Sequence, residues 1–196
     1  MIKKVCVFAS SCNFLEEDYY KSASALGELL ARNNFEMVYG GSCLGLMWAC
    51  AEQVKNNNSK IYGVMPKKLY EMGVFTDECV ELTVTEGMRE RKALMDKLSD
   101  AVVALPGGFG TLEELAEMIV QKQLGYNQKP IILLNTNGFY DKLVEFFDEI
   151  ILQKFARKDA SNLYFVANSP NEVIEYLKNY KVLGYKIGKT EIYNRD

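Results

Sequence analysis

Apolar segments of strand length alternate with amphipathic segments of helical length from one end of the chain to the other. Strands are predicted at residues 4–9, 35–39, 61–65, 79–83, 101–105, 130–134 and 163–166. Helices are predicted at residues 15–33, 44–57, 87–98, 112–124, 138–155 and 171–180. This alternation is typical of a parallel sheet with helices on both faces. We therefore expect an α/β protein with a three-layer, Rossmann-like fold and an open, mostly parallel sheet of about seven strands.

Two stretches of the chain interrupt this alternation. Residues 67–78 have no clear period, and we interpret them as a loop and a candidate lid over the substrate. Residues 182–196 follow the last predicted helix and are predicted to form an edge strand or an arm on a partner subunit. No repeat, low-complexity block or linker divides the rest of the sequence, so residues 1–181 are predicted to form a single domain.

The composition narrows the classes of function. A chain of 196 residues with 48% hydrophobic content can build one substantial core. The net charge is −3 and the basic residues are spread along the chain, which argues against binding to a nucleic-acid polymer. No long apolar segment indicates membrane insertion or export, so we expect a cytoplasmic protein that binds a small molecule.

The chain contains no histidine, which excludes Ser-His-Asp and Cys-His triads and histidine zinc sites. Its cysteines form no Cys-x-x-Cys pair, and we interpret them as buried reduced thiols rather than a disulfide framework or zinc site. The five are Cys6, Cys12, Cys43, Cys50 and Cys79. Catalysis must therefore use carboxylates, Arg, Lys, Tyr, Cys or backbone dipoles, and we expect neither a metal nor a cofactor.

The most informative segment is AVVALPGGFGTLEEL at residues 101–115. It joins a buried strand to a glycine-rich turn and the start of a helix, where free backbone N–H groups bind phosphate well. Thr111 and Glu114 have the spacing of a capping box, which would explain Glu114 structurally. The alternative is a functional carboxylate beside the bound phosphate, which the neighbouring Glu113 favours because one acid suffices for the helix dipole.

A second glycine-rich turn, VYGGSCLGLM at residues 38–47, contains Gly40, Gly41 and Gly45. It lacks the Gly-Lys-Ser/Thr ending of a P-loop, which disfavours an ATPase. Glu113 stands where a dinucleotide fingerprint has its third glycine, which disfavours an NAD site. The two turns either are tight connections or form adjacent walls of one crevice, sized for a mononucleotide.

The predicted helix at residues 87–98 carries an arginine on its apolar face. On a helical wheel, Arg91 falls near the centre of a stripe formed by Met88, Leu94, Met95 and Leu98. A guanidinium in such a place is costly unless it meets an anion. Either Arg91 forms a structural ion pair with a core carboxylate, or it faces the nucleotide with Lys92 beside it.

The motifs PGGFGTLEE and MRERK together resemble those of the Lonely Guy (LOG) family of cytokinin riboside 5′-monophosphate phosphoribohydrolases. The likeness begins at VCVFASS, continues through YGGSCLGLM and GVMP, and ends at about Tyr180. It implies hydrolysis of the N-glycosidic bond of an adenosine 5′-monophosphate, ideally with an N6-prenyl group, to free base and ribose 5-phosphate. It also implies a homodimer with sites near the subunit interface.

The resemblance assigns Arg91 and Glu114 to the catalytic pair. The residues that it assigns to substrate binding are Gly41, Glu71, Met88, Lys92, Pro106, Gly107, Gly108, Phe109, Gly110, Thr111 and Glu113. Departures from the usual family pattern at Ser42, Trp48 and Arg89 concern base selectivity more than fold.

Other activities remain as alternatives to a prenyl-specific enzyme. One is a nucleotide 5′-monophosphate nucleosidase of broader specificity, and another is a nucleotide or cofactor carrier without catalysis. Members of the family have often been labelled lysine decarboxylases. Pyridoxal-phosphate chemistry needs a Schiff-base lysine and partners for the ring, and the sequence contains no such constellation.

Overall fold

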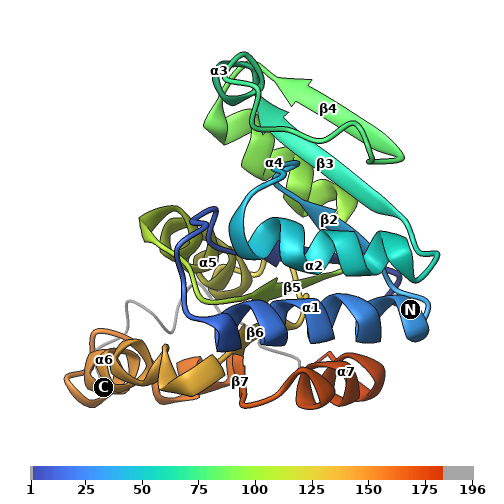
Figure 1. Cartoon of the computed structure of the whole chain (residues 1–196). Coiled ribbons are helices and arrows are strands. Elements are labelled where there is room, and N and C mark those ends of the chain that lie inside the picture. The colour runs from blue at the N-terminus through green and yellow to red at the C-terminus, as the bar shows by residue number, and fades with distance from the viewer. Residues whose placement is uncertain (1, 183–196) are drawn as a thin grey trace.

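The computed structural model describes residues 2–182, which form a seven-stranded, all-parallel sheet (Figure 1). The strands are β1 (Lys4–Phe8), β2 (Glu36–Tyr39), β3 (Ile61–Pro66), β4 (Glu81–Thr85), β5 (Ala101–Ala104), β6 (Ile131–Leu134) and β7 (Phe165–Ala167). Their order across the sheet is β4-β3-β2-β1-β5-β6-β7. The predicted Rossmann-like α/β fold is therefore confirmed.

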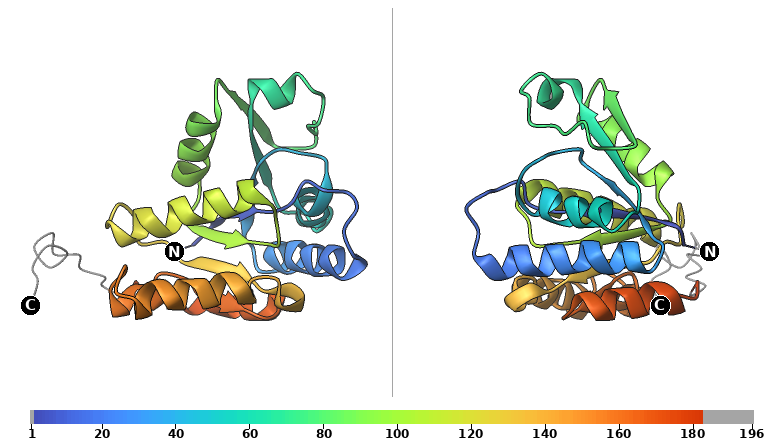
Figure 2. Two further views of the ribbon diagram at one scale, coloured as in Figure 1. Left: turned by 90° about the vertical axis from the view of Figure 1, so that its left-hand side faces the viewer. Right: turned by 45° about the vertical axis from the view of Figure 1, so that its right-hand side comes forward.

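Helices cover both faces of the sheet, as the sequence predicts. They are α1 (Glu17–Arg32), α2 (Gly45–Asn56), α3 (Lys67–Tyr70), α4 (Met88–Leu98), α5 (Phe109–Gln123), α6 (Asp141–Leu152) and α7 (Pro170–Asn179), with short 3-10 turns η1 (Thr136–Gly138) and η2 (Lys158–Asn162). Side chains of α1, α2 and α7 pack on one face, and those of α4, α5 and α6 pack on the other. Figure 2 shows α4 and α5 on the side opposite α1 and α2.

The central strand β1 explains why its sequence is apolar without alternation. Val5 and Val7 contact the core under α1, α2 and α7, whereas Cys6 and Phe8 contact the core under α4, α5 and α6. Successive strand residues point to opposite faces, so a strand covered on both sides is apolar throughout.

The direction of strand addition reverses at β1, which pairs with β2 on one side and with β5 on the other. Ligands of open parallel sheets bind at such a reversal, beyond the carboxyl ends of the strands. The loops that follow β1 and β5 meet there, since the Ser10 N–H donates to the Pro106 carbonyl at 3.2 Å. The fold thus brings the first glycine-rich turn, the second and the β1–α1 loop to one edge.

Several local predictions need correction. Residues 67–78 are not a plain loop, because α3 occupies their first third. Helix α6 begins after residue 140 rather than at 138, since Asn137 and Gly138 adopt positive φ angles of 54° and 71° that end the preceding turn. The predicted tail at 182–196 lies outside the described residues except for Val182. The domain limits therefore stay a prediction.

The five cysteines are free thiols, but only Cys6 and Cys50 are buried. Cys12 is exposed and Cys43 and Cys79 are half-buried, so the prediction that all are buried was wrong. Within residues 2–182, no helix combines the length and apolar character needed to cross a membrane.

Candidate active site

The PGGFGT turn leads directly into α5 and leaves the start of that helix uncapped. The N-cap residue Gly108 makes no side-chain cap, and the first bond of the helix runs from the Leu112 N–H to the Gly108 carbonyl at 3.0 Å. Among the described residues, no acceptor takes the N–H groups of Phe109, Gly110 and Thr111. Such groups at the positive end of a helix form an anion site.

The predicted capping box at this helix start was wrong. Helix α5 begins at Phe109, so Thr111 is the third helical residue rather than the cap. The Glu114 carboxylate bonds to Arg91 and not to the backbone of Thr111. Glu114 therefore has no capping role in this structure.

The glycines of the turn differ in what requires them. A Cβ at Gly107 would lie 2.5 Å from the Thr111 Cβ, so the turn itself needs this glycine. At Gly108 and Gly110, a Cβ would meet no atom within 4 Å, and neither residue has a positive φ. Neither packing nor backbone strain demands glycine at these two positions, and both leave open space beside the free N–H groups.

The glycine-rich turn at residues 38–47 has a different role. The Gly45 N–H donates to Asn13 Oδ1 at 2.8 Å, and the N–H groups of Leu46 and Met47 donate to the Ser10 carbonyl at 2.9 and 3.3 Å. The β1–α1 loop thus occupies the donors at the start of α2. The donors at the start of α2 are thus taken, whereas those at the start of α5 are free to bind a phosphate.

Arg91 projects from α4 into the space between the two turns. Its Nε donates to the Val64 carbonyl at 3.0 Å, and its Nη1 lies 2.5 Å from Glu114 Oε1. A Cβ on Gly40 would contact Nη2. The sequence analysis identified the turn at Gly40 but not its contact with Arg91. The available signal was an arginine on an apolar helix face, because a buried guanidinium needs a neighbour without a side chain.

Arg91 and Glu114 are 7% and 6% exposed, so they form a buried ion pair between α4 and α5. The structure shows the first alternative for Arg91, an ion pair with a core carboxylate, and that carboxylate belongs to the candidate catalytic residue Glu114. The second alternative, that Arg91 faces the nucleotide, stays a prediction. Burial is the largest influence on Glu114 and raises the pKa of its carboxyl, while the Arg91 guanidinium opposes the rise. A carboxylate held in this way is suited to interact with developing positive charge or to accept a proton.

Lys92, one residue further along α4, faces α5 as well. Its ammonium pairs with Glu113 and lies 2.5 Å from Glu117 Oε2. Burial alone would lower the pKa of Lys92, but the two carboxylates hold it above its ordinary value. The assignment of Lys92 and Glu113 to nucleotide binding stays a prediction, and in this structure they tie α4 to α5.

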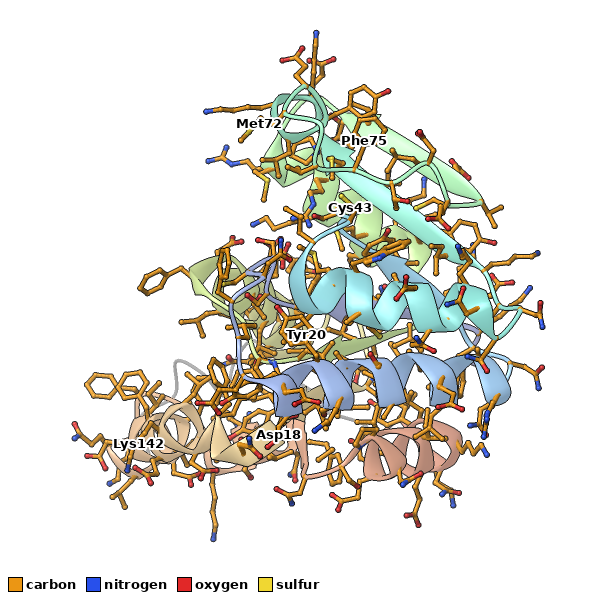
Figure 3. All side chains as sticks on the ribbon, viewed as in Figure 1. Asp18, Tyr20, Cys43, Met72, Phe75 and Lys142 are labelled. Atoms are coloured by element: carbon orange, nitrogen blue, oxygen red, sulfur yellow. The ribbon has the colours of Figure 1, made fainter. Side chains whose placement is uncertain are left out.

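The segment after β3 packs on the glycine-rich turn at residues 38–47. The Cys43 N–H donates to the Val74 carbonyl at 3.1 Å, and the Thr76 N–H donates to the Gly41 carbonyl at 3.3 Å. Ser42 and Phe75 form an antiparallel bridge between the two segments, and Figure 3 labels Cys43 and Phe75 where they meet. The candidate lid is thus attached to the turn whose Gly40 lies against the Arg91 guanidinium.

The other predicted substrate contacts lie at the edge of this region. Glu71 is exposed at the end of α3, and Met88 is half-exposed at the start of α4. Phe109 is 91% exposed at the start of α5. Among the departures from the family pattern, Trp48 packs against the core and Arg89 is exposed. No group of three potential metal ligands occurs among residues 2–182.

Comparisons with known proteins agree with the sequence motifs. The family model described as "Possible lysine decarboxylase" matches residues 47–177, which include both Arg91 and Glu114. A probable cytokinin riboside 5′-monophosphate phosphoribohydrolase of Oryza sativa subsp. japonica is 39% identical over 178 residues, which are 91% of this chain and 73% of that protein. The chain belongs to the Lonely Guy family.

Other relatives in the Lonely Guy family are similar over comparable lengths. A cytokinin riboside 5′-monophosphate phosphoribohydrolase of Arabidopsis thaliana is 38% identical over 91% of this chain and 84% of its own. Among solved structures, the molybdenum cofactor carrier protein of Chlamydomonas reinhardtii superposes with a TM-score of 0.71 at 23% identity, over 91% of this chain and 97% of that one. That likeness shows a shared fold.

Proposed function

We propose that the protein hydrolyses the N-glycosidic bond of an N6-prenylated adenosine 5′-monophosphate, giving the free base and ribose 5-phosphate. The observation that carries this proposal is the position of Glu114. It is buried against Arg91 of α4, and it lies on α5, the helix whose first N–H groups are free. Glu114 follows Phe109 by five residues, about 7 Å along the helix axis. The names of the curated relatives support the same reaction.

The residues have distinct parts in the proposed reaction. The N–H groups of Phe109, Gly110 and Thr111 hold the 5′-phosphate. As the bond between C1′ and the base nitrogen breaks, its electron pair leaves with the base and positive charge develops on the ribose. The Glu114 carboxylate stabilises that charge. The oxygen of a water molecule then bonds to C1′, and the departing base gains a proton.

Arg91 acts through Glu114 in this scheme. Its Nε and Nη1 are bonded to the Val64 carbonyl and to Glu114, which fixes the carboxylate and favours its ionised form. Arg91 is therefore a positioning residue for the reactive carboxylate. The sequence alone left the role of Arg91 open between a structural ion pair and a contact with the nucleotide.

The proposal is tested by incubating the protein with prenylated AMP, AMP and other nucleoside monophosphates and measuring the free base. Glu114→Gln should lower base release at least about 100-fold while nucleotide affinity changes little. Glu117→Gln, the same change at a half-buried position of α5 that pairs with Lys92 rather than with Arg91, is the matched control. Binding without base release would indicate a carrier and overturn the proposal, and equal rates with all nucleotides would indicate the broader nucleosidase.

The pH dependence of the reaction gives a second test of Glu114. Because its pKa is raised by burial, the carboxylate form should appear only above the ordinary glutamate range. We expect the acid limb of kcat/KM to rise with pH and to have its midpoint above 4.5. A midpoint at or below that value would contradict the assignment of the limb to Glu114.

We also propose that two copies of the chain associate through α5 and α6. No residue of α6 is buried, and its Phe146 is 59% exposed. Leu112 and Val120 on α5 are exposed as well. An apolar groove of about 190 Å³, lined by residues that include Ile119, Val120 and Phe147, lies between the helices. Exposed apolar surfaces of this kind mark interfaces.

The oligomeric state decides the proposal on association. Sedimentation or light scattering should give twice the mass of the chain, and Val120→Glu should give a monomer. A monomeric wild type would overturn it. Helix α5 also carries Glu114, and its first residues belong to the PGGFGT turn at residues 106–111, which we call the phosphate turn. The active sites of the two copies would therefore lie close to this interface.

A further inference from the structure

A tyrosine hydroxyl contacts the backbone just before the phosphate turn. Tyr140 is buried, and its hydroxyl donates to the Leu105 carbonyl at 2.7 Å. Leu105 immediately follows β5 and precedes Pro106. The pairing of β5 with β6 ends at Ala104, so this carbonyl lies beyond the ladder. Tyr140 therefore supplies the partner that the sheet does not.

Tyr140 is itself held in place by the turn that precedes α6. Its N–H donates to Asn135 Oδ1 at 2.7 Å, and Asn135 Nδ2 donates to Asp141 Oδ1 at 2.7 Å. The Asn135 N–H donates to the Ala167 carbonyl at 2.7 Å, which joins the turn to β7. Burial raises the pKa of the Tyr140 phenol, so the hydroxyl stays a donor at neutral pH.

The phosphate turn has few other attachments to the rest of the fold. The Leu105 N–H donates to the Phe8 carbonyl at 2.9 Å and the Pro106 carbonyl accepts from the Ser10 N–H at 3.2 Å, so both bonds join backbone to backbone at β1 and the loop after it. The bond from Tyr140, by contrast, is made by a side chain, which comes from the connection between β6 and α6. Since catalytic geometry is sensitive to small displacements, a shift of Leu105 would move the N–H groups that begin α5.

We propose that Tyr140 is a positioning residue for the phosphate turn, whose hydroxyl anchors Leu105 and thereby fixes the direction of the N–H groups of Phe109, Gly110 and Thr111. Tyr140 does not touch the substrate in this proposal. The identification of the bound anion as a nucleotide phosphate rests on the proposed function. The positioning of the turn does not, so the two can be tested apart.

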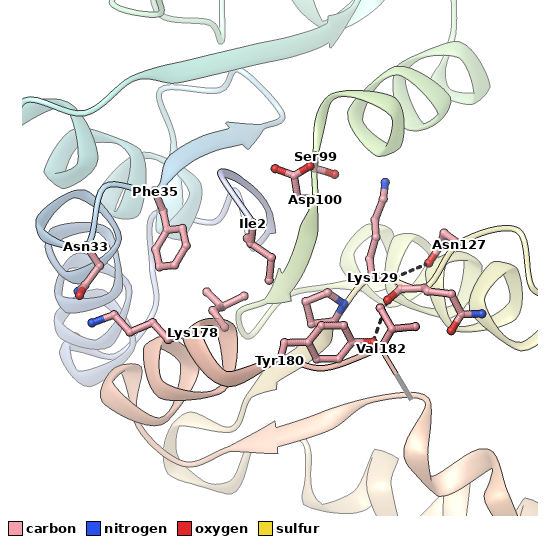
Figure 4. A pocket seen from close by; sticks show the side chains of 13 residues that line it. Ile2, Asn33, Phe35, Ser99, Asp100, Asn127, Lys129, Lys178, Tyr180 and Val182 are labelled. Carbon is pink, nitrogen blue, oxygen red and sulfur yellow. Dashed lines mark hydrogen bonds between the residues drawn. The ribbon is translucent and has the colours of Figure 1, made fainter. Parts of the chain in front are cut away.

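Tyr140→Phe removes one oxygen atom and leaves the aromatic ring in the core. Tyr180→Phe is a matched control, since the Tyr180 hydroxyl also donates to a backbone carbonyl, that of Gln128, at 2.8 Å. Figure 4 shows this bond in a pocket of about 730 Å³. The pocket is lined by Ile2, Asp100 and Pro130, which precede β1, β5 and β6, so it lies at the opposite edge of the sheet.

The first measurement is the affinity for ribose 5-phosphate, AMP and adenosine by calorimetry. We expect Tyr140→Phe to bind both phosphate compounds about tenfold more weakly and adenosine as the wild type does. Tyr180→Phe should bind all three normally. A Tyr140→Phe protein that melts at a lower temperature but keeps its affinity for ribose 5-phosphate would overturn the proposal, as would equal losses in the two variants.

The second measurement does not depend on any substrate. In the ligand-free protein, the backbone amide resonances of Gly107, Gly108 and Gly110 should shift in Tyr140→Phe and stay in place in Tyr180→Phe. Unmoved resonances in Tyr140→Phe would overturn the positioning role whether or not the protein cleaves a nucleotide. Absence of base release by the wild type, with shifted resonances in the variant, would contradict the proposed function alone.

Discussion

A buried lysine in α5 allows a stability prediction whose sign and size follow from the structure. Lys122 is 3% exposed, and no carboxylate among residues 2–182 forms an ion pair with it. Its Nζ lies 5.4 Å from the centre of the Tyr180 ring. Burial lowers the pKa of Lys122 from 10.5 to about 8, because the charged form loses its hydration. The folded state therefore binds this proton less tightly than the unfolded state.

The magnitude follows from linkage between protonation and folding. One pKa unit corresponds to about 1.4 kcal/mol, so the charge on Lys122 destabilises the folded state by about 3 kcal/mol below pH 8. The cation–π contact with Tyr180 offsets about 1 kcal/mol of this. Lys122→Met keeps an unbranched side chain and removes the charge. We expect it to raise the free energy of unfolding by about 2 kcal/mol at pH 7.

The gain should depend on pH in a defined direction. Between pH 8 and 10.5 the folded state has lost the proton and the unfolded state still binds it, so wild-type stability rises with pH. The advantage of Lys122→Met therefore falls to below about 1 kcal/mol by pH 10. Effects of other titrating groups are common to both proteins and cancel in the difference.

Urea unfolding of both proteins at pH 7 and pH 10 measures this difference from the midpoint and slope. Lys129→Met is the control, because the Lys129 ammonium is bonded to the carbonyl and carboxylate of Asp96 and its loss should destabilise. A Lys122→Met protein no more stable than wild type at pH 7 would refute the reasoning, and so would a gain that is the same at pH 10.

The remaining predictions concern the candidate active site. Gly110→Ala should keep or raise the melting temperature, because alanine favours the helix. It should also reduce nucleotide affinity, because its methyl group would lie beside the free N–H groups. A normal affinity would contradict the anion site. Gly40→Ala should displace the Arg91 guanidinium and lower base release. Gly87→Ala is the control, because its Cβ would meet nothing within 4 Å and the rate should not change. Equal rates in the two variants would contradict the role of Gly40. Arg91→Ala should lower the free energy of unfolding by about 3 kcal/mol at pH 7 and abolish base release. The raised pKa of Glu114 means that the stability loss should shrink as the pH falls toward 5; a pH-independent loss in urea unfolding would argue against a buried carboxylate.

The sequence predicts the fold well because local patterns determine it. Each strand is a short apolar run and most helices have a clear apolar face. The succession of elements along the chain and the layered architecture therefore follow from this alternation. The helical period also places Arg91 correctly on the inner face of α4. Its partner could be suggested only by the family resemblance, because helical periodicity does not specify contacts between helices.

Contacts over long separations in sequence are the part that the pattern does not reveal. The Asn13 side chain accepts a hydrogen bond from the Gly45 N–H at the start of α2, and the Tyr140 hydroxyl donates to the Leu105 carbonyl, 35 residues away in the sequence. Both contacting residues lie outside the regular elements, where no period constrains them. The capping-box prediction failed for a related reason, since Glu114 is drawn to a buried guanidinium rather than to its own helix terminus.

Helix α5 carries both the free N–H groups at Phe109 to Thr111 and the Glu114 carboxylate. In the proposed function, one rigid element therefore sets the distance from the phosphate to the reacting carbon. Each residue of a helix turns by about 100°, so a one-residue insertion between Gly110 and Glu114 would direct the carboxylate away from the sugar. A second phosphate group would likewise displace the ribose along the helix. Selection of monophosphates is then a matter of helical register, and changes in the surrounding segments can alter base preference without disturbing it.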